Sequence, residues 1–130
     1  MAANARSARL LARLLAGAGT VHFLAPKPFD AMIPRTLPGS PRAWTYASGA
    51  AELAIAAAIA VPRTRRAGAV AAAGLFAVVF PANVKMAHDW RNRPAPLKAA
   101  AYARLPGQVP LILWALHTAR EAARPGAASD

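Results

Sequence analysis

Four polar side chains lie inside otherwise apolar segments: His22, Glu52, Asn83 and Gln108. An imidazole and a carboxylate can exchange protons, whereas the two amides can only donate and accept hydrogen bonds. A lone carboxylate in apolar surroundings must be either protonated or paired with a cation. The candidate partners of Glu52 are His22, Lys85, Arg104 and Tyr46, the last only as a hydrogen-bond donor.

The elements that would position these side chains are four apolar segments of the 130-residue chain. A helix needs roughly 20 residues to cross a hydrocarbon core of about 30 Å. The segments cover residues 8–25, 43–61, 67–86 and 100–119. They predict an all-α fold, a four-helix transmembrane bundle in a single domain of residues 1–130, with residues 120–130 as a flexible tail. A soluble alanine-rich bundle is the alternative, but the second and third segments show no charged face.

Counting about 1.5 Å per helical residue places all four polar side chains in the outer half of such a bundle. At that depth they should face the bundle interior rather than lipid. Their shared depth predicts a ligand-binding polar pocket formed by His22, Glu52, Asn83 and Gln108. Asn83 and Gln108 have a structural alternative, which is to tie helices together or to satisfy the carbonyls that Pro81 and Pro110 leave without donors.

Composition excludes several classes of site. The chain has no cysteine, so disulfides and thiolate chemistry are excluded. Its net charge of +11 comes from arginines in short groups that flank the apolar segments, a pattern typical of membrane spans rather than of a nucleic-acid interface. Three dispersed histidines without an acidic cluster predict no metal site. A haem with two axial histidines is disfavoured but left open, because His117 lies far from the other two histidines while His22 and His88 both lie near the outer end.

The connections between the segments also carry information. Residues 26–41 contain five prolines, which leave room only for a short interfacial helix beginning at Pro28, with Phe29, Met32 and Ile33 as apolar anchors. The compact basic turn at residues 63–66 favours a cytoplasmic location for both termini. Arginines without acids before Asp30 leave a cleavable targeting peptide open as an alternative, although Arg13 interrupts its apolar core.

Several stretches together resemble the DoxX-like family of small bacterial membrane proteins. They are the His22-Phe23 pair with Pro26, Ser48-Gly49 with Glu52, the turn at residues 62–65, Phe80-Pro81-Ala82-Asn83 with Met86, and Arg104-Leu105-Pro106 with Gln108. The resemblance implies a four-helix bundle in the bacterial plasma membrane and an association with quinone-linked redox enzymes. Some related proteins act as assembly chaperones. Without cysteine, a thiol-based role of relatives cannot be carried over.

The sequence therefore predicts an auxiliary subunit of a membrane redox system, not catalytic by itself, whose polar pocket holds a quinone head group or a partner's polar residue. The alternative is an assembly chaperone or scaffold that binds other membrane helices through small residues at four-residue spacing, Ala50, Ala54 and Ala58. A small carrier is disfavoured, since four helices without an inverted repeat leave little room for alternating access. The expected partners are the bilayer and either a membrane protein or a second copy of the chain.

Overall fold

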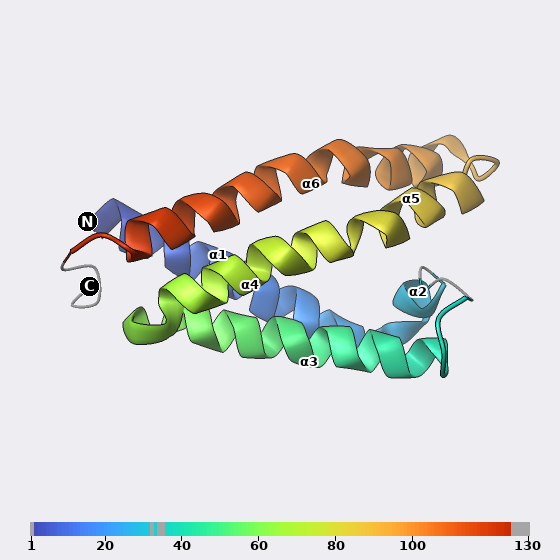
Figure 1. The fold of residues 1–130 in the computed structure, drawn as a ribbon. Coiled ribbons are helices and arrows are strands. Elements are labelled where there is room, and N and C mark those ends of the chain that lie inside the picture. The colour runs from blue at the N-terminus through green and yellow to red at the C-terminus, as the bar shows by residue number, and fades with distance from the viewer. Residues whose placement is uncertain (1, 32, 34–35, 126–130) are drawn as a thin grey trace.

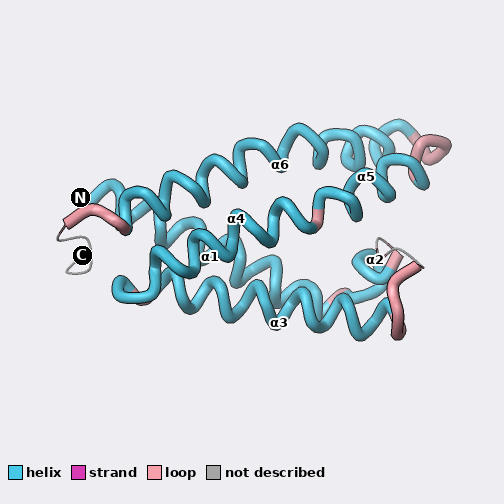
Figure 2. The backbone as a smooth tube through the Cα atoms, viewed as in Figure 1, coloured by secondary structure: helices cyan, strands magenta, loops and turns pink. Residues whose placement is uncertain are grey.

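The computed structural model describes residues 2–31, 33 and 36–125, and all regular secondary structure in these ranges is helical (Figure 1). In chain order the elements are α1 (Ala2–Leu24), α2 (Pro26–Asp30), α3 (Pro41–Ala60), the 3₁₀ turn η1 (Pro62–Thr64), α4 (Arg65–Val78), α5 (Phe80–Asp89) and α6 (Ala95–Ala122). Short loops connect most of them, as Figure 2 shows. The all-α prediction is confirmed.

Prolines and one serine set the ends of these helices. Ser40 accepts a hydrogen bond from the backbone N–H of Ala43 at 3.2 Å, and Pro41 occupies the first turn of α3, where its missing N–H costs nothing. The helical stretch from Pro62 to Asp89 is interrupted at Val79, between α4 and α5 and two residues before Pro81. Pro81 accounts for this break, because a proline removes one backbone donor and clashes with the preceding turn.

The long helices form one bundle. α1 packs along α3, α3 against α4, and α4 along α6, while α6 also contacts α1 and so closes the ring. Both ends of the described chain lie at one end of the bundle, and α2 and the α5–α6 turn lie at the other (Figure 1). We call these the terminal end and the loop end.

The apolar core fills the half of the bundle near the terminal end. It centres on Leu11, Leu15, Ile59, Phe76 and Ala115, which are at most 7% exposed. The loop half is built differently, because its buried side chains include His22, Asn83 and Gln108. Polar groups therefore occupy the interior positions that the apolar core leaves.

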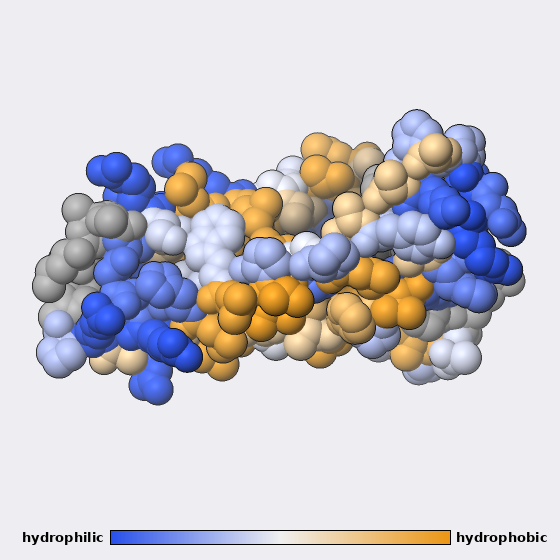
Figure 3. Space-filling model, turned by 90° about the horizontal axis from the view of Figure 1, so that it is seen from above, coloured by the Kyte–Doolittle hydropathy of each residue, from blue (hydrophilic) through white to orange (hydrophobic). Residues whose placement is uncertain are grey.

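The outer surface of the bundle is apolar around its middle. In Figure 3, hydrophilic residues gather at both ends of the molecule and hydrophobic residues between them. Large apolar side chains are exposed on each of the long helices, including Leu14 of α1, Leu53 of α3, Val70 of α4 and Leu113 of α6. An apolar band that runs over several helices marks an interaction surface for lipid or protein.

The four spans are only partly supported. Among the described residues, one helical stretch, Pro62–Asp89, is long and apolar enough to cross a membrane, and a core helix of a soluble protein would pass the same test of length and composition. α6 continues to Ala122, within the segment 120–130 that was predicted as a tail, and residues 126–130 lie outside the described residues, so the flexible tail stays a prediction. The short helix begins at Pro26 rather than Pro28, since Pro26 already supplies the proline of its first turn.

Candidate functional site

The structure brings His22 and Glu52 together near the loop end. Nδ1 of His22 lies 3.2 Å from Oε2 of Glu52, and the two side chains are only 10% and 13% exposed. His22 is in the last turn of α1 and Glu52 is in the middle of α3. The pair therefore joins two neighbouring helices inside the bundle.

A close approach of the two backbones makes this pairing possible. A Cβ atom placed on Gly19 would lie 2.9 Å from the carbonyl oxygen of Gly49, and one on Gly49 would lie 2.8 Å from Cβ of His22. Both distances are shorter than real Cβ contacts allow, so α1 and α3 can only come this near because both positions are glycine. Phe29 of α2 then covers the imidazole, with the ring centroids 3.8 Å apart and the planes 21° from parallel.

The hydrogen bonds of His22 define what the pair can do. Nδ1 lies 2.7 Å from the carbonyl oxygen of Ala18, one helical turn earlier, which can only accept a hydrogen bond. Nδ1 therefore carries a proton, and it faces both this carbonyl and the Glu52 carboxylate. That arrangement leaves Nε2 as the ring atom available for a hydrogen bond to another group. The pair can thus hydrogen-bond a polar group.

Asn83 and Gln108 are buried in the same half of the bundle. Their exposed fractions are 1% and 6%, and they lie on α5 and α6, which pack against each other. Oε1 of Gln108 accepts no hydrogen bond from a described residue, whereas Asn83 and Glu52 both have partners. The cavity between α2, α3 and α5 and the groove between α1 and α3 are lined by other residues, so a single shared pocket of these four side chains remains a prediction.

The other predicted partners of Glu52 lie elsewhere or make different contacts. Lys85 donates to the Asp89 carboxylate at 2.5 Å and to the carbonyl of Ala31 at 3.2 Å. Tyr46 stacks on Phe23, with the centroids 5.2 Å apart. The side chain of Arg104, the remaining predicted partner, lies outside the described residues. So does Met32, which was predicted as an apolar anchor of the short helix.

A cavity of about 490 Å³ opens at the loop end, between α2, the start of α3 and α5. Its charged lining residues form two ion pairs, Asp30 with Arg42 at 2.8 Å and Lys85 with Asp89. Asp30, which lines the cavity, directly follows Phe29, whose ring stacks on His22. Because its charges are paired within the wall, the cavity suits a polar neutral group better than a strongly charged one.

Asp30 is held in place from two sides. The buried hydroxyl of Thr45 donates to its Oδ1 at 2.6 Å, and Nε of Arg42 donates to its Oδ2. The Thr45 hydrogen bond first, and then the Arg42 guanidinium, hold the pKa of Asp30 below its ordinary value. Similarly, the Lys85 ammonium lowers the pKa of Asp89. Sequence reasoning missed the Asp30 group, since nothing in the spacing of residues 30, 42 and 45 signals it.

Arg65 was predicted only as part of a basic turn, and it has a structural role. Its side chain is buried, and its Nε donates to the carbonyl of Ile59 at 2.8 Å and its Nη2 to that of Ala60 at 3.3 Å. The guanidinium therefore satisfies the carbonyls at the end of α3. Its position directly after the four residues 61–64 that connect α3 to α4 is a signal that could have predicted this role.

Contacts between the two ends of the chain close the bundle at the terminal end. Nε1 of Trp114 donates to Oγ of Ser7 at 2.8 Å, and the Asn4 amide donates to the Glu121 carboxylate. Among the residues that the structure places, no group of three or more histidine, cysteine, aspartate or glutamate side chains could hold a metal ion.

Comparison with known proteins corrects the predicted family. The model of a domain of unknown function, DUF8561, matches residues 11–119. No curated protein and no solved structure matches the chain. The resemblance to the DoxX-like family is therefore wrong. Its motifs are short combinations of glycine, proline and polar residues in apolar helices, which any small helical bundle of this composition can contain.

Proposed function

Because the chain belongs to the DUF8561 family, whose function is unknown, we propose a function from its own residues: a four-span membrane protein that binds a small molecule with a hydrogen-bonding head group at His22 and Glu52. The observation that carries the proposal is this buried pair, which joins two helices whose outward faces are apolar. In a membrane, an interior ionisable pair is by default a functional site, because burying it is costly.

The surface supports the membrane setting. Exposed apolar side chains occupy the middle of the four long helices, and arginines cluster at the ends. Such a band would be an aggregation liability in water, whereas in a bilayer it faces hydrocarbon. The arginine-rich terminal end then lies in the cytoplasm and the loop end on the opposite side.

The site supports the ligand class. Phe29 stacks on His22, its neighbour Asp30 lines the cavity at the loop end, and Oε1 of Gln108 offers a further buried acceptor in the same half of the bundle. A short-chain quinone in its reduced form is a suitable test ligand, because its hydroxyls can donate hydrogen bonds to the Glu52 carboxylate and its flat face stacks on aromatic rings. The predicted role as a subunit of a redox system rested on the resemblance to the DoxX-like family. Because that resemblance is wrong, the redox role is not part of the proposal.

Binding of a short-chain quinone in its reduced form to the purified full-length protein, kept free of oxygen and followed by quenching of the protein's tryptophan fluorescence, tests the proposal. We expect Glu52→Gln to weaken binding roughly 10- to 100-fold, since a hydrogen bond to a charged group contributes about 1.5–3 kcal/mol. Glu121→Gln is the matched control, because Glu121 lies at the terminal end beside Asn4. If Glu52→Gln binds the quinone as tightly as Glu121→Gln while both fold normally, the ligand site is wrong.

The topology can be tested separately, and the absence of native cysteine makes the labelling free of background. We expect a membrane-impermeant maleimide added to the cytoplasmic side to label Arg63→Cys and not Arg91→Cys, and the reverse from the other side. Both positions are exposed and lie at opposite ends of the bundle. Labelling of both from one side contradicts the four-span arrangement.

The scaffold alternative gains no separate support. Of the three alanines predicted to bind other helices, Ala58 already packs within the chain, where it meets Gly68 of α4. Ala50 and Ala54 are exposed on α3. The alternative stays a prediction.

A further inference from the structure

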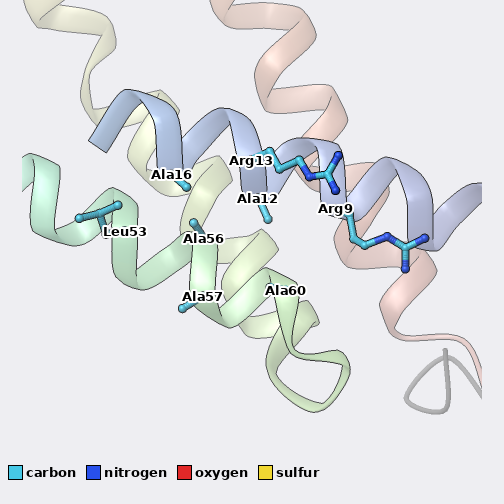
Figure 4. Close-up of a pocket in the computed structure, with 8 residues that line it drawn as sticks. All are labelled: Arg9, Ala12, Arg13, Ala16, Leu53, Ala56, Ala57 and Ala60. Carbon is cyan, nitrogen blue, oxygen red and sulfur yellow. The ribbon is translucent and has the colours of Figure 1, made fainter. Parts of the chain in front are cut away.

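A groove of about 440 Å³ runs between α1 and α3 in the half of the bundle near the terminal end. Ala12 and Ala16 line it from α1, and Ala56 and Ala57 from α3. Figure 4 shows the α1 alanines turned toward α3 across this groove. Because alanine methyls are short, the helices leave a channel here on the surface, although they touch at Gly19 and Gly49 farther along.

Two arginines stand at the terminal end of this groove. Arg9 and Arg13 are one helical turn apart on α1, and in Figure 4 both side chains reach along α1 toward the terminal end. Both residues are exposed, and the structure gives neither a hydrogen bond nor an ion pair with another described residue. Two adjacent guanidinium groups above an apolar channel form a site for an anion that carries a hydrocarbon tail.

We propose that this groove binds an anionic phospholipid of the leaflet at the terminal end, with the phosphate on Arg9 and Arg13 and one acyl chain between α1 and α3. The proposal rests on the membrane location proposed above but not on the quinone site, which lies in the other half of the bundle. The direction of the groove fits, because its cationic mouth is at the end of the molecule and its alanine floor leads toward the apolar middle.

Charge favours a lipid over a second copy of the chain. In a membrane, a second copy of the same orientation would bring its own arginine-rich terminal end beside the first. The one described carboxylate at this end, that of Glu121, is already engaged by Asn4 and Arg124. A second copy would therefore place its arginines beside Arg9 and Arg13, whereas a lipid phosphate would neutralise the charge of these two arginines.

Native mass spectrometry of the full-length protein, titrated with phosphatidylglycerol or with phosphatidylethanolamine, tests the site. We expect one tightly bound phosphatidylglycerol and no comparable phosphatidylethanolamine. The double variant Arg9→Ala/Arg13→Ala should lose roughly 25-fold in affinity, since each arginine near an anionic lipid contributes on the order of a factor of five. Ala57→Leu, which fills the groove without changing charge, should also release the lipid.

The matched control is Arg63→Ala/Arg66→Ala, which removes the same charge from exposed positions at the same end but outside the groove. It should retain the bound lipid. Three results would each overturn the proposal. They are an equal loss of affinity in both double variants, equal binding of the two lipids, and a dimer, with no lipid complex, that Ala57→Leu dissociates. If maleimide labelling shows that the chain does not span the membrane, the proposed function is wrong. Loss of the lipid site alone would leave the proposed function standing, so the two results are distinguishable.

Discussion

The contact of α1 with α3 at Gly19 leads to the most direct test of the structure. In Gly19→Ala the new methyl would lie 2.9 Å from the carbonyl oxygen of Gly49 and 3.0 Å from Cγ of Leu53. A backbone carbonyl cannot rotate away as a side chain can, so the two helices must move apart. We expect this variant to be less stable than its control and to lengthen the distance between His22 and Glu52.

The control is Gly17→Ala, two residues earlier on the same helix, where a Cβ meets nothing within 4 Å. Both substitutions gain the same helix propensity, up to about 1 kcal/mol, so this contribution cancels in their difference. What remains is the cost of overpacking, roughly 1–3 kcal/mol. For a chain of this size that corresponds to a difference in Tm of roughly 3–12 °C.

The assay is thermal unfolding of both variants in the same detergent, followed by circular dichroism at 222 nm. We expect Gly17→Ala to unfold at or slightly above the temperature of the unmodified protein and Gly19→Ala clearly below it. Equal melting temperatures for the two variants would refute the close approach of α1 and α3, and with it the reason for the pairing of His22 with Glu52.

Two further predictions concern the ends of the bundle. Arg65→Met should lower the free energy of unfolding by about 1.5–3 kcal/mol, because the carbonyls of Ile59 and Ala60 lose charged donors, and chemical denaturation should show no such loss for the exposed Arg66→Met. The pKa of Asp30 is lowered in the folded protein, so its contribution to stability is present above the ordinary value of 3.8 and is lost as pH falls below it. Melting temperatures between pH 5 and pH 2.5 should therefore fall more steeply for the unmodified protein than for Asp30→Asn, and parallel curves would contradict the role of this carboxyl.

Local sequence was enough to predict that the four apolar segments are helical, but not where each helix begins. α1 starts at Ala2 and α6 at Ala95, six and five residues before the predicted segments 8–25 and 100–119. The starts at Pro41 and Pro62 and the break before Pro81 follow from steric and hydrogen-bonding rules that act within a few residues. The polar residues within the apolar segments were equally visible. The family could not be identified from the sequence motifs, because short motifs in alanine-rich helices recur in proteins without common descent.

Only the tertiary structure decided which polar groups meet. From sequence, Lys85 and His22 were equal candidates for Glu52, and depth alone could not separate them. The fold pairs Glu52 with His22, since two glycines let α1 and α3 touch, and it turns Lys85 toward Asp89, one helical turn away. The position of a residue in the sequence determines which helix it belongs to and how far along that helix it lies. The partner of its side chain depends on which helices are neighbours and on how closely their backbones approach.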